Sequence, residues 1–216
     1  MTKSEPTPAP ATPRRTRMSA AERRATILDA AIEVFAELGY QRSKISTIAA
    51  RVGVSEPVVF QNFGSKSALF AAVLQRAADQ LADNARPALE ADQSVLAFLT
   101  EQMSPQHLEA LHAHGSAGVL FSDAMGLTAD PEVAAAARSA VQRVAEVLAD
   151  LINKGQQAGE LRQDLDPNTG AWWLLSLLAA HRFRAAVLED HADLEEQLAT
   201  LSLETLTGPA SKRASG

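Results

Sequence analysis

The side chains best suited to direct chemistry lie in one short stretch near the N-terminus. Gln61 and Asn62 carry amides, which can form paired hydrogen bonds with adenine in the major groove of DNA. Pro57 and Val58 add apolar surface of the kind that contacts thymine methyl groups. Together these residue types favour contact with nucleic acid. The alternative for the stretch is an ordinary bend between two core helices. The alternative for either amide is that it contacts only phosphate or water.

Two short helices joined by a tight turn are expected to hold these side chains. Apolar residues of the first helix recur at helical spacing: Ile45, Ile48, Ala49 and Val52. Ser43 is a good N-cap for this helix, and Gly53 accepts the left-handed conformation that ends it. A second helix can begin at Ser55, because Pro57 is tolerated in a first turn. A helix, a glycine-containing turn and a second helix are typical of a helix-turn-helix, whose second helix reads bases.

The uneven distribution of charge supports a nucleic-acid partner for the N-terminal part. The whole chain of 216 residues has a formal net charge of -6. Residues 1–66 nevertheless hold ten Lys or Arg and six Asp or Glu, whereas residues 67–216 hold ten and twenty. A basic head on an acidic body suits phosphate binding by the head. A basic run at residues 14–17 could be either a DNA-contacting arm or a solvated tail.

The segment from Ile27 to Phe70 resembles the DNA-binding domain of the TetR family of transcriptional regulators. The residues that match the family pattern are Ile27, Leu28, Ala30, Ala31, Phe35, Gly39, Tyr40, Ile48, Ala49, Gly53, Val54, Ser55, Phe60, Phe63, Ser65 and Lys66. The resemblance implies that Lys66 contacts a phosphate. We therefore expect a DNA-binding surface made by Lys44, Ser55, Glu56, Pro57, Val58, Phe60, Gln61, Asn62, Lys66, Arg14, Arg15 and Arg17.

An all-α fold of about nine or ten helices is expected, with a three-helix head on a larger helical body. Residues 1–17 are expected to form a disordered basic arm and residues 18–65 the helix-turn-helix domain. Residues 66–208 are expected to form an effector-binding and dimerisation domain, followed by a flexible tail at 209–216. Start signals for the long body helices are Asp130 before Pro131 and Asp166 before Pro167. The resemblance also implies that the helix after Ser65 connects head and body.

The helix expected at residues 169–188 is apolar on nearly every side, which indicates that a second surface covers it. We interpret that surface as a partner copy of the chain, and the resemblance implies a four-helix bundle across a two-fold axis. The expected interface residues are Leu148, Ile152, Trp173, Leu174 and Leu178.

A small apolar effector is the second expected partner of the body. Residues that could line its pocket are Phe98, Met103, His107, Phe121, Met125, Trp172 and Leu175. Plain core packing is the alternative for each of them. His107, His112 and His114 could also form a metal site with His181. We expect no metal, because residues two apart point to different faces of a helix.

The sequence gives little support to catalysis or to membrane insertion. The chain contains no cysteine, which excludes disulfides and thiolate chemistry and fits a reducing cytoplasm. It shows no nucleophile elbow, no phosphate-binding glycine loop and no zinc-protease motif. Its longest apolar run, at residues 171–180, is about half the length of a bilayer span. We therefore expect no enzyme, no cofactor and no membrane contact.

The most favoured function is a dimeric repressor that binds a palindromic operator and is released by a small molecule. The same fold could instead serve an activator, or a regulator controlled by a partner protein. A third class is an effector-binding or enzymatic helical protein whose head no longer binds DNA. Salt-dependent binding to a defined palindrome would exclude this third class.

Overall fold

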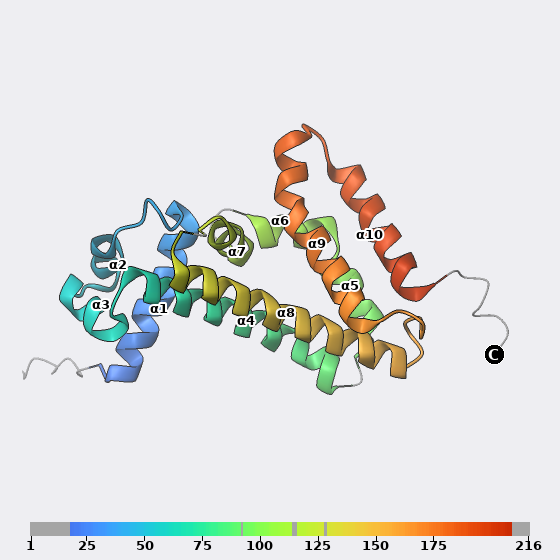
Figure 1. Ribbon diagram of the computed structural model, residues 1–216, viewed down its shortest axis with the longest axis horizontal. Coiled ribbons are helices and arrows are strands. Elements are labelled where there is room, and N and C mark those ends of the chain that lie inside the picture. The colour runs from blue at the N-terminus through green and yellow to red at the C-terminus, as the bar shows by residue number, and fades with distance from the viewer. Residues whose placement is uncertain (1–17, 92, 114–115, 128, 209–216) are drawn as a thin grey trace, which may run out of the picture.

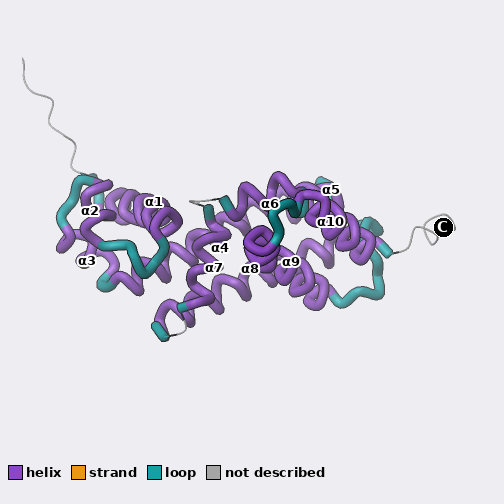
Figure 2. Tube along the Cα trace, turned by 90° about the horizontal axis from the view of Figure 1, so that it is seen from above, coloured by secondary structure: helices purple, strands orange, loops and turns teal. Residues whose placement is uncertain are grey.

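The computed structural model describes residues 18–91, 93–113, 116–127 and 129–208. Within these ranges the chain forms ten α-helices and no strand, which confirms the expected all-α fold. The molecule is elongated, with a three-helix head at one end and the last helix near the other (Figures 1 and 2). The expected arm at residues 1–17 and tail at 209–216 lie outside the described residues.

The head consists of α1 (Ala20–Leu38), α2 (Ile45–Val52) and α3 (Glu56–Phe63). A capping box starts α1, because Ser19 accepts a hydrogen bond from the Glu22 N–H and the Glu22 side chain accepts one from the Ser19 N–H. Gly53 ends α2 in the left-handed conformation, with φ 73°. The chain then turns directly into α3, so that the sequence pattern of a helix-turn-helix is confirmed.

Ser43 does not cap α2, contrary to the sequence expectation. The N-cap residue is Lys44, and its side chain makes no capping hydrogen bond. Ser43 is buried, and its hydroxyl donates to the Gly39 carbonyl at 2.6 Å and lies 3.3 Å from the Val34 carbonyl. Its hydroxyl therefore satisfies carbonyls at the end of α1, which holds the link between α1 and α2 against the core.

The long helix α4 (Lys66–Glu90) leaves the head and runs beneath the body. Ser65 caps it by accepting a hydrogen bond from the Ala68 N–H at 2.8 Å. The helix contains Pro87 and continues for three more residues beyond it. Pro87 is exposed, while Ala85 and Ala88 on either side are buried, so that packing outweighs the backbone hydrogen bond that proline cannot donate.

Three short helices follow and lead to three longer ones. The short ones are α5 (Val95–Gln102), α6 (Pro105–His112) and α7 (Ala117–Gly126). The longer ones are α8 (Pro131–Gln157), α9 (Pro167–Val187) and α10 (Ala192–Thr207). Helix α8 lies along α4, and α9 folds back across α8. Helix α10 then returns beside α9 (Figure 1). Asp130 and Asp166 cap α8 and α9 as the sequence predicted.

Two hydrophobic cores hold these helices. The first joins the head to the start of the body, because α1, α2, α3 and α4 share it with Leu120 and Ala124 of α7 and with Val133, Ala137 and Ala140 of α8. The second lies inside the body, between the far ends of α4 and α8 and helices α5, α9 and α10. Helix α3, the second helix of the helix-turn-helix, therefore packs on a core that extends into the body.

No helix in the described part of the chain is long and apolar enough to cross a bilayer.

Replacing Gly118 by Ala should destabilise the protein, although alanine favours helices. A Cβ at Gly118 would lie 2.5 Å from the Leu111 carbonyl oxygen, which is backbone and cannot turn away. We expect Gly118→Ala to lower the free energy of unfolding by about 1–3 kcal/mol. Gly126 ends the same helix with nothing near its added Cβ, so that Gly126→Ala should be neutral or stabilising by up to about 1 kcal/mol. Urea unfolding of the two variants makes the comparison, and equal effects would contradict it.

Candidate DNA-binding interface and effector cavity

Helix α3 presents most of the predicted DNA contacts on one exposed surface. Val59 and Phe63 are buried and anchor the helix in the head core. The exposed residues around these anchors are Lys44, Ser55, Glu56, Pro57, Phe60 and Gln61, while Val58 and Asn62 are half-buried. Glu56 is the one acidic residue of the helix. We call this set, from Lys44 to Asn62, the reader surface.

The two amides of the reader surface differ in what they are free to do. Gln61 is exposed, and within the described residues its side chain makes no hydrogen bond to the protein. The Asn62 amide instead donates to the Val58 carbonyl of its own helix at 2.7 Å. Gln61 is therefore better placed to read a base, whereas Asn62 must first break a bond within α3.

Phe60 lies within the reader surface, and Lys66 lies beside it. Phe60 is 44% exposed. The Lys66 ammonium lies 4.5 Å from the centre of the Tyr40 ring and 3.4 Å from the Gln41 carbonyl oxygen, to which it donates. Partial burial lowers the pKa of Lys66 from its ordinary value. Its charge is therefore close to the end of α1 and held in place by the ring.

Arg24 is a head cation that the sequence did not reveal. Its guanidinium lies 4.0 Å from the centre of the Phe63 ring and donates a hydrogen bond to the Asn62 carbonyl at the end of α3. A cation there stabilises the C-terminus of the reader helix. No local pattern signals this role, because Arg24 and Asn62 are 38 positions apart.

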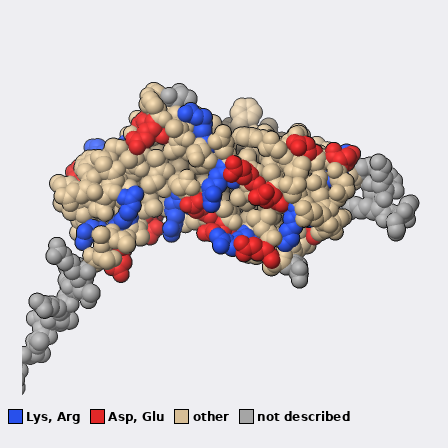
Figure 3. Space-filling view, turned by 60° about the horizontal axis from the view of Figure 1, so that its bottom comes forward, with Lys and Arg blue, Asp and Glu red and all other residues tan. Residues whose placement is uncertain are grey.

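Other basic side chains of the head are held at its surface. Arg51 pairs with Glu33 and Glu37 of α1, and these bonds raise the pKa of Arg51. Arg42 remains exposed, with its Nε donating to the Leu38 carbonyl at 2.9 Å. In the body, basic and acidic side chains are interspersed across the middle of the molecule (Figure 3). One ion pair of the body joins Arg143 of α8 to Asp79 of α4. The expected contacts Arg14, Arg15 and Arg17 lie outside the described residues.

The body contains a small apolar cavity of about 40 Å³ between α5, α6, α8, α9 and α10, which is partly open to solvent. Its lining residues come from all five helices and are Leu99, Gln102, Met103, Leu108, Leu148, Leu174, Leu177, Leu178, Arg184, Glu195, Leu198 and Ala199. Aliphatic side chains dominate, and no aromatic ring is among them. The space suits aliphatic groups but is small in this conformation.

The cavity is not where the sequence placed the effector pocket. Of the seven residues expected there, Met103 alone belongs to its lining. Phe98 packs on the body core and Phe121 on the head core, while Met125 and Trp172 are exposed on the surface. Leu175 and His107 are half-buried outside the lining. Helical periodicity cannot tell which core an apolar side chain enters, or whether it stays on the surface as Met125 and Trp172 do.

The expected dimer contacts also divide between interior and surface. Leu148, Leu174 and Leu178 line the cavity, and Ile152 is fully buried in the body core. Trp173 is the exposed member of the set. Other large apolar side chains are exposed along α9 and were not predicted: Phe183 and Val187, in line with Trp172. Sequence periodicity does not distinguish a helix face turned to the same chain from one turned to a partner.

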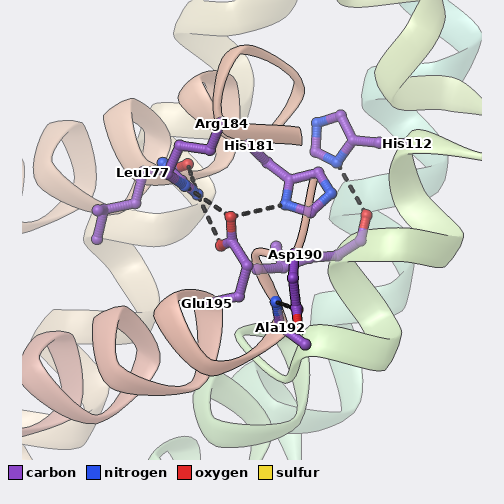
Figure 4. A network of polar contacts seen from close by, with 8 residues as sticks. His112, Leu177, His181, Arg184, Asp190, Ala192 and Glu195 are labelled. Carbon is purple, nitrogen blue, oxygen red and sulfur yellow. Dashed lines mark hydrogen bonds and ion pairs between the residues drawn. The ribbon is translucent and has the colours of Figure 1, made fainter. Parts of the chain in front are cut away.

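A buried polar network closes the cavity where α9 meets α10 (Figure 4). The Arg184 guanidinium donates to both oxygens of Glu195, at 2.6 and 2.8 Å. Burial opposes ionisation of Glu195, but the bonds from Arg184 outweigh it and lower the pKa of Glu195. His181 lies 3.3 Å from the same carboxylate. The only strongly charged groups at the cavity therefore neutralise one another.

His112 packs beside this network without forming a metal site. Its ring centre lies 4.8 Å from that of His181, and its Nδ1 lies 2.9 Å from the Leu108 carbonyl. Burial lowers the pKa of His112. Among the residues that the structure describes, no three His, Asp or Glu side chains converge as metal ligands. His114 lies outside those residues.

Two protein-family models match the chain. The model described as bacterial regulatory proteins, tetR family, matches residues 27–73, which include the whole reader surface. The model described as tetracyclin repressor-like, C-terminal domain, matches residues 127–201.

Known proteins resemble both parts of the chain. The HTH-type transcriptional activator FasR of Mycolicibacterium smegmatis is 34% identical over 155 residues, which cover 70% of this chain and 68% of FasR. The HTH-type transcriptional repressor Rv1474c of Mycobacterium tuberculosis is 26% identical over 79% of this chain and 86% of its own length. The transcriptional regulator FadR from Bacillus subtilis, solved in complex with stearoyl-CoA, shares the fold with a TM-score of 0.65 and 18% identity, covering 84% of this chain and 98% of that one.

Replacing Gln61 should change the sequence preference of DNA binding, whereas replacing Lys66 should change its overall strength. Gln61→Ala should flatten the preference at one base pair per half-site by about 1–3 kcal/mol, because a base contact is lost. Lys66→Ala should weaken binding to all sequences alike. It should also lower the slope of log affinity against log salt concentration by about one unit, because one phosphate contact is lost. The measurement is binding of each variant to every single-base mutant of an operator recovered by in vitro selection, at several salt concentrations. Gln197→Ala, at an exposed site on α10, is the control. If Gln61→Ala weakens all sequences equally, Gln61 reads no base.

Proposed function

The chain belongs to the TetR family of DNA-binding transcriptional regulators, and we propose that it binds a palindromic operator as a homodimer and is released by a small apolar molecule. The observation that carries the proposal is the reader surface, where an exposed helix is anchored from below by Val59 and Phe63. A rigid helix with exposed apolar and amide side chains suits the major groove. The proposal includes the cytoplasm as its compartment, because the DNA is there.

An apolar stripe on α9 supports the homodimer. Trp172, Ser176, Ala179, Phe183 and Val187 recur at intervals of three or four residues and are all exposed, so that they lie on one face of the helix. The polar member, Ser176, donates its hydroxyl to the Trp172 carbonyl of the same helix, and a soluble monomer rarely exposes so many apolar side chains in one row. A second copy related by a two-fold axis would cover this strip with the same strip of its partner. This stripe replaces the cavity-lining leucines as the proposed interface.

The aliphatic cavity supports an apolar effector. A water molecule needs about 10–15 Å³ of such space, so the cavity holds only a few waters and a larger ligand must separate the surrounding helices. That requirement is useful, because a ligand shifts a conformational equilibrium only when it binds one state better than the other. FadR binds stearoyl-CoA in its solved structure, so that a molecule with an acyl chain is the effector class we propose.

The direction of control has two candidates. We propose repression, in which the bound dimer blocks transcription and the ligand lifts the block. The name of FasR favours an activator instead. A reporter gene behind the selected operator separates them, because deletion of the regulator raises expression in the first case and lowers it in the second.

Phe183→Glu should break the dimer and leave the protomer folded. Phe183 is 70% exposed in the protomer, so a charge there costs little unless a partner covers it. We expect a dimeric wild type and a monomeric variant in analytical ultracentrifugation, with helical content unchanged. Gln197→Glu, exposed on α10, should remain dimeric. A monomeric wild type at micromolar concentration, or a dimeric Phe183→Glu, would overturn the proposed interface.

Filling the cavity should abolish the ligand response without weakening DNA binding. Ala199 lines the cavity and the adjacent Thr200 is exposed, so Ala199→Leu fills the space whereas Thr200→Leu does not. Stearoyl-CoA should weaken operator binding by the wild type and by Thr200→Leu about tenfold or more. Ala199→Leu should bind the operator with the affinity of the wild type, and stearoyl-CoA should leave that affinity unchanged. Fluorescence anisotropy gives the affinities. If the acyl-CoA neither binds the wild type nor releases its DNA, the proposed effector class is wrong.

A further inference from the structure

Three carboxylates around the connection between α7 and α8 bond to the head. Asp130, the N-cap of α8, accepts hydrogen bonds from the Ser67 hydroxyl at 2.6 Å and the Tyr40 hydroxyl at 3.1 Å. On α7, Asp123 accepts one from the Tyr40 backbone N–H at 2.5 Å. Glu132 lies 3.4 Å from the Ser65 hydroxyl, which donates to it. Tyr40 lies in the link between α1 and α2, whereas Ser65 and Ser67 lie at the start of α4, so these bonds join α7 and α8 both to the head and to the helix that leaves it.

The two oxygens of Asp130 have separate roles. Oδ1 accepts from the Val133 N–H at 3.3 Å and caps α8, whereas Oδ2 accepts from both hydroxyls. The hydrogen bond from Ser67 and that from the Val133 N–H lower the pKa of Asp130, so that it is ionised at neutral pH. Burial raises the pKa of Tyr40, whose hydroxyl therefore keeps the proton that it donates. Helix capping needs only the first oxygen.

The contact beneath these bonds is apolar. Leu120, Val133 and Ala137 of the body are buried against the head core that contains Phe70. Apolar contacts are not directional, so they hold the two parts together without choosing one angle between them. Hydrogen bonds weaken steeply when their geometry changes. The bonds to Asp130 can therefore select one angle from those that the apolar contact allows.

We propose that Asp130 is a positioning residue that fixes the angle of the head on the body through Tyr40 and Ser67. That angle determines the position of the reader surface relative to the reader surface of the second protomer. The predicted effect on DNA binding therefore rests on the dimer proposed above. Helix α8 continues from Asp130 to Leu148 in the cavity lining, so that a displacement of α8 reaches the head through the same bonds.

Asp130→Ser separates positioning from capping. Serine caps helices about as well as aspartate, but it has no second oxygen to accept from the two hydroxyls. Tyr40→Phe removes the other partner and keeps the ring that packs on Phe35 and Phe70. Asp166→Ser is the matched control, because Asp166 also caps a helix before a proline, but its side chain bonds, among the residues that the structure describes, only to Thr169 of that helix.

The head angle can be measured within one protomer. The chain has no cysteine, so spin labels attach only to cysteines introduced at two exposed sites, Ala25 on α1 and Asn153 on α8. Labelled protein is diluted with unlabelled protein, and pulsed electron paramagnetic resonance gives the distance distribution between the labels. Asp130→Ser and Tyr40→Phe should each broaden the distribution about twofold, and the double variant should add little, because the same bond is lost. Asp166→Ser should match the parent.

DNA gives the second readout. The unlabelled wild type should prefer the selected operator over operators whose half-sites are moved by one base pair, and Asp130→Ser should lose most of this preference. An unchanged distance distribution in Asp130→Ser, an equal broadening in Asp166→Ser, or an unchanged spacing preference overturns the proposal. Lower melting temperature with an unchanged distribution would mean a structural role only. A monomeric wild type would overturn the dimer, but the distance within the protomer would still decide whether Asp130 fixes the head.

Discussion

The packing of the head onto α4 and α8 is the constraint on which the rest of the structure depends. Helix α3 has eight residues, too few to be stable alone in water, and only Val59 and Phe63 anchor it. Its support comes from α1 and α4, where the Phe70 ring lies 4.9 Å from that of Phe35 and 4.8 Å from that of Tyr40. The same core includes Val133 at the start of α8. The helix proposed to read DNA is thus held by the helices that lead to the proposed effector cavity.

The body combines features that suit a molecule with two conformations. Its cavity is lined by five helices and has a volume of only about 40 Å³, so that a ligand larger than a few waters must move at least one of them. The charged groups beside it, Arg184 and Glu195, neutralise each other and leave the space apolar. On the outside, α9 carries an exposed apolar stripe. Helix α9 therefore contributes both to the proposed pocket and to the proposed interface. A ligand in the pocket can thereby change the geometry of the dimer interface.

Much of the head could be predicted from the sequence, because its signals are local. The capping box at Ser19, the glycine after α2 and the proline in α3 each depend on neighbours within a few residues. Ser43 was assigned one position too early as a cap, since a serine beside a helix start can also bond the preceding helix. Long-range roles escaped prediction. Arg24 at the end of α3 and Asp130 against Tyr40 depend on contacts between distant residues, and helical periodicity could not tell cavity from partner surface.

A hydroxyl-radical footprint of the full-length protein on its selected operator tests most directly whether two rigidly held reader surfaces act together. The two copies of α3 should enter the major groove on one side of the DNA, so that two protected regions appear about one helical turn, or a multiple of it, apart. Both regions should appear together as the protein concentration rises. A single protected region, or two that fill independently, would contradict the dimeric reader.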